Sequence, residues 1–215
     1  MTRDVNRRAY RSTKRQAAAE ATRQAILAAA HQLFIGQGYA RTTVAEIADR
    51  ASVNVDTIYA TVGRKPELMR AVLEAAISGV AHAVPAAQRD YVRAIRAAPE
   101  AEDKLAIYAS ALAEMAPRTA PVFEALRLAG LTDPTCADLH AEITGRRAGN
   151  MRQLAAELRS TGRLRRDLTD DEVADIIWSM NSADYYLLLV RDRGWSTEQY
   201  GTHLADAWRR ILLAD

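Results

Sequence analysis

The stretch that decides the fold is residues 42–68, TTVAEIADRASVNVDTIYATVGRKPEL. Thr43 stands three residues before Glu46, the spacing of a capping box at the start of a helix. Apolar residues then recur at helical intervals, and Asn54 offers a cap for a second, shorter helix over residues 55–62. A helix that short is marginal alone, so we expect it to pack against the helix before it. Two short crossing helices of this kind indicate a helix-turn-helix.

The second helix would present short polar side chains to DNA. With Ile58 and Val62 turned inward, its outer faces carry hydroxyl and small groups, which suit insertion into a major groove. Lys65 opens a third helix with a proline in its first turn, and a phosphate can bind both its charge and the free amides there. An ordinary helical hairpin in an all-α core is the alternative. We expect phosphate contacts mostly from Thr42, Thr43, Thr57, Tyr59 and Lys65, and base contacts from Asn54, Val55, Asp56, Ala60 and Thr61.

Residues 21–73 resemble the N-terminal domain of TetR-family transcriptional repressors. The resemblance rests on the Gly38-Tyr39 turn, the Thr42-Thr43 pair, the Ile47-Ala48 core pair, the Thr57-Ile58-Tyr59 triplet and Lys65. It implies an all-α protein of about nine helices, with an N-terminal three-helix helix-turn-helix domain and a C-terminal helical domain for ligand binding and dimerisation. It also implies a ligand-responsive repressor that binds a pseudo-palindromic double-stranded DNA operator as a homodimer and is released by a small organic effector.

Three positions depart from the family pattern. Ser52 stands in the turn where the family usually carries glycine, and a left-handed backbone there would cost roughly 1 kcal/mol. Val62 replaces the usual aromatic residue, which reduces the packing between helices. Val55 lies where a polar base-reading residue often stands, so it would contact a thymine methyl or read nothing. These departures leave the fold intact and change the expected tilt of the second helix.

Composition separates a basic end from a mildly acidic remainder. The first 65 residues hold eleven Lys/Arg and five Asp/Glu, and the rest hold eighteen and twenty-two, so the formal charges are +6 and −4. This asymmetry fits a DNA-reading head on a ligand-binding trunk. One cysteine, Cys136, excludes an intramolecular disulfide and fits a reducing cytoplasm. No apolar run reaches the roughly 18 residues of a membrane helix, so we expect a cytoplasmic protein with no membrane contact.

Three regions are expected along the chain. Residues 1–16 read as a disordered basic arm, 17–65 as the helix-turn-helix domain, and 66–215 as the helical ligand-binding and dimerisation domain. The arm would follow phosphates or enter a minor groove, or it is a solvated tail. Its cationic residues are Arg3, Arg7, Arg8, Arg11, Lys14 and Arg15.

Dimerisation is expected through the last two helices. Residues 173–190 are apolar on more than one face, and the last helix adds another apolar stripe. A single trunk would bury one face, so the family resemblance implies a four-helix interface between two subunits. The alternative is that both faces are buried in one larger core.

No catalytic constellation is recognisable, and we expect neither an enzyme nor a cofactor or metal site. The four histidines lie on different predicted helices without metal spacing. The family resemblance implies instead a trunk pocket with apolar walls and a few polar groups. Asn181 and Asp184 interrupt an otherwise apolar helix, so a ligand or a cross-subunit hydrogen bond would satisfy them. The candidate liners are Tyr108, Met115, Phe123, Met151, Trp178, Asn181 and Tyr185.

Two other functional classes stay open. One is a DNA-binding activator or architectural protein that responds to no ligand. The other is an all-α binding protein or enzyme whose head has lost its function. The basic head and its set of hydroxyl side chains argue against the second class.

Overall fold

Helices form all of the regular structure in the part of the chain that the computed structural model describes, residues 3–80 and 82–214, with side chains from residue 14 onward. The all-α prediction is therefore confirmed. The chain divides into two compact units, Met1–Ala83 and Val84–Asp215. None of the described helices is both long enough and apolar enough to cross a membrane.

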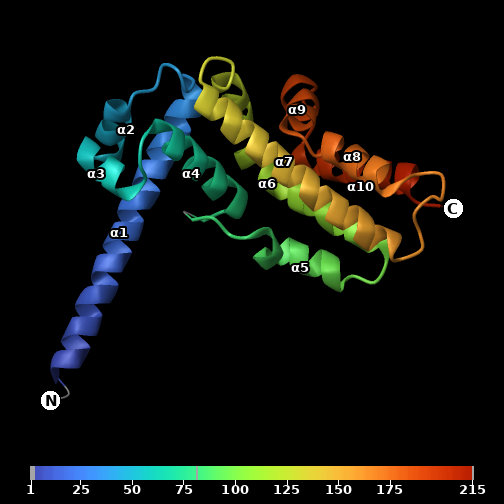
Figure 1. Ribbon diagram of the computed structural model, residues 1–215, viewed down its shortest axis with the longest axis horizontal. Coiled ribbons are helices and arrows are strands. Elements are labelled where there is room, and N and C mark those ends of the chain that lie inside the picture. Colours follow the sequence, from blue (N-terminus) through green and yellow to red (C-terminus); the bar gives the residue numbers. More distant parts are fainter. Residues whose placement is uncertain (1–2, 81, 215) are drawn as a thin grey trace. The chain divides into compact units, whose positions relative to one another are not determined.

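The first unit holds four helices around one core. α1 packs against both α2 and α4, and α2 contacts α3. In Figure 1 the second half of α1 lies beside the other three helices, and its first half extends beyond them. The core residues of α1 are Ile26, Leu27, Ala30, Leu33 and Phe34, and those of α4 include Leu68, Met69, Val72 and Leu73. The bounds are α1 (Arg3–Gly36), α2 (Val44–Ala51), α3 (Val55–Thr61) and α4 (Lys65–Ser78).

Two expected boundaries differ from the structure. The backbone is helical from Arg3, where the sequence predicted a disordered arm over residues 1–16. Residues 3–16 contain no glycine or proline and are rich in arginine and other good helix formers, so the helix packed at residues 26–34 extends through them. Residues 1–2 and the side chains of residues 3–13 lie outside the described part. The first unit also includes α4, which the sequence assigned to the trunk, because α4 buries its apolar face against α1.

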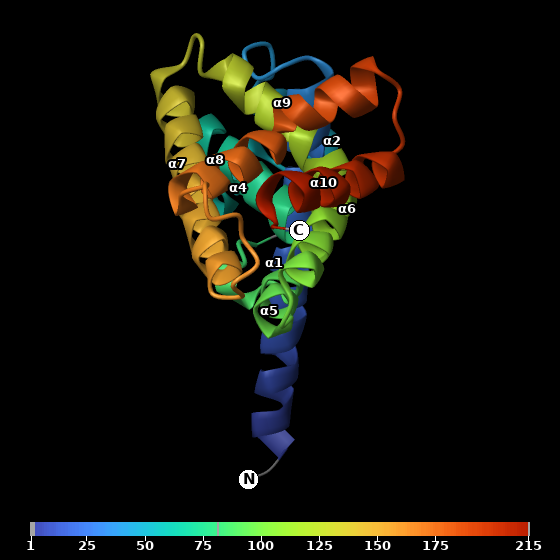
Figure 2. The same ribbon diagram turned by 90° about the vertical axis from the view of Figure 1, so that its right-hand side faces the viewer.

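The second unit is built on α6. This helix contacts α5, α7, α9 and α10, and α7 in turn contacts α8. Figure 2 shows α10 crossing α6. Gly201 of α10 permits this approach, because a Cβ there would lie 2.9 Å from the Cβ of Ala113. The bounds are η1 (Ala86–Gln88), α5 (Asp90–Ala97), α6 (Ala101–Ala129), α7 (Pro134–Arg159), α8 (Asp170–Met180), α9 (Ala183–Tyr186), the π-helix η2 (Leu187–Asp192) and α10 (Thr197–Leu212).

α6 continues through two internal prolines. The sequence predicts a bend bracketed by Pro117 and Pro121, followed by a separate short helix over residues 123–131. The structure has one helix from Ala101 to Ala129. Each proline removes one backbone hydrogen bond, and burial on both sides of the pair holds the helix together. The buried residues beyond the prolines include Val122, Ala125 and Leu126.

The capping-box spacing of Thr169 and Glu172 predicts one long helix that continues to Arg193. In the structure this helix is broken near its middle. α8 ends at Met180, with Asn181 as its C-cap, and Ser182 caps α9 by accepting a hydrogen bond from the Tyr185 amide at 3.1 Å. Asn181 and Ser182 hydrogen-bond readily to nearby backbone and side-chain groups, which favours a helix end over a helix interior. The polar interruption in the sequence is thus an interruption of the helix itself.

The apolar stripe of α10 is buried in its own unit. Tyr200, Leu204, Trp208 and Leu212 are at most 1% exposed and belong to the core with residues of α6. For these residues the larger-core alternative holds, because α6 covers them within the same chain. Two large apolar side chains of the last segments stay exposed, Leu188 at 54% and Ile211 at 37%.

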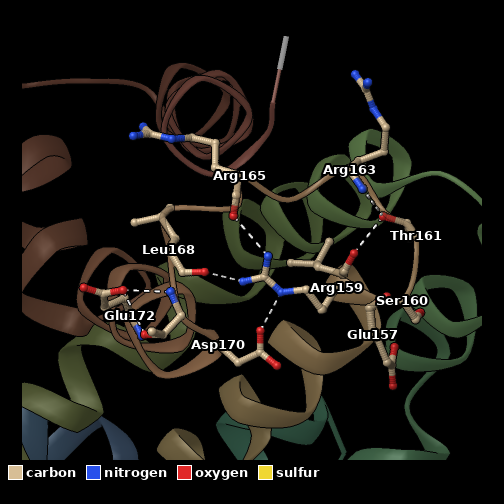
Figure 3. Close-up of polar contacts among 11 residues, drawn as sticks. Glu157, Arg159, Ser160, Thr161, Arg163, Arg165, Leu168, Asp170 and Glu172 are labelled. Atoms are coloured by element: carbon tan, nitrogen blue, oxygen red, sulfur yellow. Dashed lines mark hydrogen bonds and ion pairs between the residues drawn. The ribbon is translucent and has the colours of Figure 1, made fainter.

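The loop between α7 and α8 is fastened by Arg159 (Figure 3). Its guanidinium donates to the Asp170 carboxylate at 2.8 Å and to the carbonyl oxygens of Arg165, at 3.0 Å, and Leu168. The same loop pairs with the end of α10, because the Arg165 amide donates to the Leu212 carbonyl at 2.9 Å and the Ala214 amide to that of Arg163 at 2.9 Å. One arginine therefore fixes a loop that otherwise has little regular structure.

Candidate functional site

α2 begins with the predicted capping box. The Glu46 amide donates to Thr43 Oγ1 at 3.1 Å, and the Thr43 amide donates to Glu46 Oε2 at 2.7 Å. The Thr43 backbone N–H, with its hydroxyl, holds the pKa of Glu46 below its ordinary value of 4.5. Gln37 at the end of α1 also donates to Glu46, at 3.3 Å. The start of α2 is therefore fixed both locally and to α1.

The turn between α2 and α3 has the left-handed residue that the family pattern requires. Ser52 has φ 56° and ψ 44°, in a position where glycine would be unstrained. Its amide donates to the Asp49 carbonyl at 3.2 Å, and the Val53 amide to the Ala48 carbonyl at 3.0 Å. These bonds close the end of α2 and offset the strain, which is about 1 kcal/mol for a non-glycine residue.

α3 is anchored on one face and leaves most of its surface exposed. Ile58 is its single fully buried residue, at 0% exposed. Arg23 of α1 donates from Nη1 to the Thr61 carbonyl at 3.0 Å, which satisfies a free carbonyl at the C-terminal end of α3. Asn54 is the N-cap residue by position, but its side chain makes no capping hydrogen bond, contrary to expectation. Its exposed amide is therefore available to a partner.

Most of the predicted DNA-contacting residues share one continuous segment. Asn54, Asp56, Tyr59 and Ala60 are exposed, with Tyr59 at 49%. Thr43 is also exposed, at the start of α2. The partly exposed residues are Val55, Thr57, Thr61 and Lys65.

Thr42 is the exception among the predicted phosphate contacts. Its side chain is 1% exposed, and its hydroxyl donates to the carbonyl oxygens of Gly38 at 2.9 Å and Leu33 at 3.2 Å. Its amide donates to the Tyr39 carbonyl at 3.1 Å. The expectation that Thr42 contacts phosphate is corrected, because the residue fastens the turn after α1 and has no free donor to offer.

Lys65 lies over the ring of Tyr39, with Nζ 4.2 Å from the ring centroid and 3.4 Å from the Ala40 carbonyl oxygen. This cation–π contact holds the ammonium beside the start of α4, which has a proline in its first turn. An open hollow adjoins this helix start and is lined by Tyr59, Gly63, Arg64 and Glu67. Arg64, the exposed N-cap residue of α4, was not among the predicted contacts. The signal that points to it is its position just before a helix start.

In the trunk, three of the predicted pocket residues meet in one polar cluster. Asn181 Nδ2 donates to the Tyr108 hydroxyl at 2.7 Å and lies 3.2 Å from the sulfur of Met151. Tyr108 is buried between the rings of Tyr91 and Trp208, with centroids 6.1 Å and 5.6 Å away. Burial raises the pKa of the Tyr108 hydroxyl, so it stays neutral and available as a hydrogen-bonding group.

Arg147 of α7 joins this cluster and was missed by the sequence analysis. Its Nη2 donates to the carbonyl oxygens of Trp178, at 3.3 Å, and Asn181, at 3.2 Å, and to the Asn181 side chain. Its guanidinium carbon lies 5.5 Å from the ring centroid of Trp178 and 5.7 Å from that of Phe123. The sequence signal was an arginine in the middle of a helix that packs against the interruption at Asn181.

The other two predicted liners lie elsewhere. The Tyr185 hydroxyl is 2.7 Å from Nε2 of His203 on α10, and Met115 is partly buried against the trunk core. The pocket itself stays a prediction. Within the described residues, no group of His, Cys, Asp and Glu is placed to hold a metal ion.

The fold and the exposed helix define an all-α protein with a helix-turn-helix in its first unit. Residues 26–72 match the family model described as bacterial regulatory proteins, tetR family. The chain has the N-terminal domain of that family and the fold of TetR-family transcriptional regulators, which confirms the resemblance found in the sequence. No curated protein matches the chain in sequence.

Similar solved structures span nearly the whole chain. A TetR-family transcriptional regulator from Rhodococcus sp. has a TM-score of 0.66 at 19% identity and covers 90% of this chain and 99% of its own. SmeT in complex with triclosan has 0.66 at 20% identity, with 91% and 93% covered. NalD of Pseudomonas aeruginosa, the secondary repressor of the MexAB-OprM multidrug efflux pump, has 0.65 at 20% identity, with 92% and 99% covered. At these identities the likeness is one of fold.

Proposed function

We propose that the chain is a homodimeric, ligand-responsive transcriptional repressor that inserts α3 into the major groove of a pseudo-palindromic DNA operator. The observation that carries this proposal is α3 itself. A seven-residue helix with one buried side chain adds little to its own stability, yet burial of Ile58, packing against α2 and the Arg23–Thr61 hydrogen bond hold it in the first unit. Such a helix is suited to present its outer face to a groove.

The outer face offers groups of two kinds. Asn54, Val55, Asp56, Ala60 and Thr61 would lie nearest the bases, and Asp56 would accept from a cytosine amino group. Thr43, Thr57, Tyr59 and Lys65 would hold phosphates. Arg64 and the backbone amides at the start of α4 would also contact phosphate, because a helix N-terminus attracts anions.

Dimerisation in this proposal uses the last segments of the trunk. Leu188 and Ile211 are exposed although they are large and apolar, and they belong to η2 and α10. Burying them against the same surface of a second copy would give a two-fold interface. The two α3 helices would then read half-sites separated by a helical turn or a multiple of it.

A small organic effector would bind in the trunk and release the operator. The cluster of Tyr108, Met151 and Asn181, with the neighbouring aromatic rings, combines apolar walls with a few polar groups. The triclosan complex of SmeT, a protein with this fold, supports an organic ligand as the effector class. The effector would act only through its differential affinity for the two trunk shapes. This role is regulatory, with no catalytic step.

The test is selection of bound duplexes from random DNA by the purified protein at two salt concentrations. Enrichment of an inverted repeat, with affinity that falls steeply as salt rises, is the expected result. Absence of any enriched sequence at both concentrations would refute operator recognition. The enriched duplex then serves as the probe for release by small molecules.

A further inference from the structure

Arg147 carries a charge that its surroundings do not neutralise. Its polar partners are two carbonyl oxygens and one amide side chain. Among the described residues, no ion pair joins Arg147 to a carboxylate. Asp184 is the acid whose charge acts on it, but Asp184 is 72% exposed and lies 3.7 Å from the guanidinium of Arg127.

Among the charged groups that act on the nearby His140, the two cations Arg127 and Arg147 outnumber the one carboxylate, Asp184. Arg147, Arg127 and His140 lie near one another with Asp184 as the acidic group, and burial followed by the charge of Arg127 lowers the pKa of His140. Burial also lowers the pKa of Arg147, although a guanidinium stays protonated in proteins. A partly buried charge without a counter-ion is unfavourable, and an anion bound beside it would relieve that cost.

A buried hydrogen-bond donor beside Arg147 also lacks an acceptor. The indole nitrogen of Trp178 is fully buried and makes no hydrogen bond within the described structure. Buried donors in native proteins are nearly always paired, so an unpaired one calls for an explanation. The ring of this tryptophan lies 5.5 Å from the guanidinium carbon of Arg147. A cation without a counter-ion and a neutral donor without an acceptor therefore belong to the same cluster.

We propose that Arg147 and the indole N–H of Trp178 bind the carboxylate of a small organic acid, whose apolar body lies against Phe123 and the neighbouring trunk side chains. The planar guanidinium matches a carboxylate through two parallel hydrogen bonds. The rings of Phe123 and Trp178, with centroids 5.7 Å and 5.5 Å from the guanidinium carbon, supply apolar walls. This inference rests on the trunk effector site of the proposed function and adds the charge class of the effector.

A purely structural role for Arg147 is the rival explanation. The carbonyls of Trp178 and Asn181 stand at the C-terminal end of α8, where a cation is favourable. These bonds all come from Nη2, and no hydrogen bond from Nε or Nη1 to another described residue is present. A structural role predicts that removing the guanidinium lowers stability. It does not predict that the protein distinguishes an acid from its neutral amide.

The experiment uses acid–amide pairs of matched shape: phenylacetate with phenylacetamide, cyclohexylacetate with cyclohexylacetamide, and decanoate with decanamide. Binding to the full chain is measured by calorimetry without DNA. We expect at least one acid to bind about tenfold or more tightly than its amide. Arg147→Gln should weaken that acid about 10- to 100-fold and leave the amide unchanged. Arg146→Gln, which removes the exposed neighbouring charge on α7, is the matched control and should leave both unchanged.

Two further variants separate binding from folding. Arg147→Lys keeps the charge and loses the planar fork, so acid binding should fall by an intermediate factor while far-UV circular dichroism stays unchanged. Trp178→Phe keeps an aromatic wall and removes the donor, so it should weaken the acid and spare the amide. Equal binding of acid and amide, no acid binding up to millimolar concentrations, or full acid affinity in a folded Arg147→Gln protein would each overturn the proposal.

Failure of this inference is distinguishable from failure of the proposed function. If the selected operator duplex is released by a neutral molecule while no acid binds, the carboxylate site is wrong and the repressor proposal stands. If the acids bind through Arg147 but leave operator affinity unchanged, the site stands and ligand control of DNA binding is wrong.

Discussion

Arg23 on α1 and Thr61 at the end of α3 are joined by a hydrogen bond of 3.0 Å, from the guanidinium to the backbone carbonyl, across 38 positions of the chain. A cation at a helix C-terminus also stabilises the helix dipole. The bond therefore fixes the end of the helix whose other faces we propose to contact DNA.

Arg23→Ala should lower the stability of the first unit by about 1 kcal/mol and weaken operator binding. All three tryptophans lie in the second unit, so unfolding of the first is read during urea denaturation as the far-UV circular dichroism change that tryptophan fluorescence does not follow. Gln24→Ala is the control, because Gln24 is exposed and bonds to Glu20 of the same helix. Unaltered stability and operator affinity in Arg23→Ala would show that this hydrogen bond supports neither the fold of the first unit nor DNA binding.

Ser52→Gly should raise the stability of the first unit by about 0.5 kcal/mol. Glycine removes the left-handed strain of about 1 kcal/mol, and its greater freedom in the unfolded chain offsets part of the gain. The midpoint of urea unfolding gives the measurement. Ser52→Ala keeps the strain, so a similar gain there would show that the effect comes from losing the hydroxyl instead.

Replacing Tyr59 and Lys65 together with alanine should weaken binding to every duplex. Removal of each phosphate-binding side chain should lower the affinity roughly tenfold or more, and removal of one positive charge should reduce the slope of log affinity against log salt by about 1. Arg93→Ala removes an exposed charge from the second unit and should leave both quantities unchanged. Wild-type affinity and slope in the double variant would refute the assignment of this surface.

Gly201→Ala should destabilise the second unit by about 1–2 kcal/mol. The added methyl would stand 2.9 Å from the Cβ of Ala113, and the overpacking outweighs the better helix propensity of alanine. Tryptophan fluorescence during urea unfolding reports on this unit. In the background of Ala113→Gly the same change should cost less, since the clashing atom is gone. If the two substitutions change the free energy of unfolding additively, the side chains at positions 113 and 201 are not in steric contact.

Glu46 should contribute to the acid sensitivity of the first unit. Its folded-state pKa is lowered by hydrogen bonds from Thr43, so it stabilises the fold above its unfolded pKa and loses that contribution as pH falls through the lower folded value. Glu46→Gln should be less stable than the wild type at neutral pH, with the difference shrinking as pH drops below 4.5. Urea unfolding across that range measures it. A difference that is constant with pH would contradict the capping role of the carboxylate.

The sequence predicted those features that depend on local patterns. The Thr169–Glu172 and Ser196–Gln199 spacings predict capping boxes like that of Thr43. All three formed, because their hydrogen bonds join residues three apart, whereas the side-chain cap expected at Asn54 did not form. The left-handed conformation of Ser52 agrees with the family resemblance, which places a glycine at this position of the turn. Features that depend on distant neighbours were missed. The burial of Thr42 depends on the end of α1, and the importance of Arg147 depends on residues about 30 positions away.

The errors in helix boundaries have a similar origin. Local signals for a break were present at Pro117 and Pro121, yet packing by α5, α7, α9 and α10 keeps α6 continuous. The signal at Asn181 was treated as a ligand contact within one helix, whereas tertiary hydrogen bonds with Tyr108 and Arg147 stabilise a helix end there. A polar residue in an apolar helix can therefore mean a break as readily as a binding site.

The two prolines of α6 also make its middle mechanically soft. Neither ring nitrogen can donate to the preceding turn, so the helix lacks two backbone hydrogen bonds about one turn apart, one at the carbonyl of Ala113 and one at that of Pro117. Ala113 also lies against Gly201 of α10. A helix bends most easily where its backbone hydrogen bonds are missing. Elastic deformation of the trunk should therefore concentrate where α6 and α10 touch, with each half of α6 moving as a stiff piece.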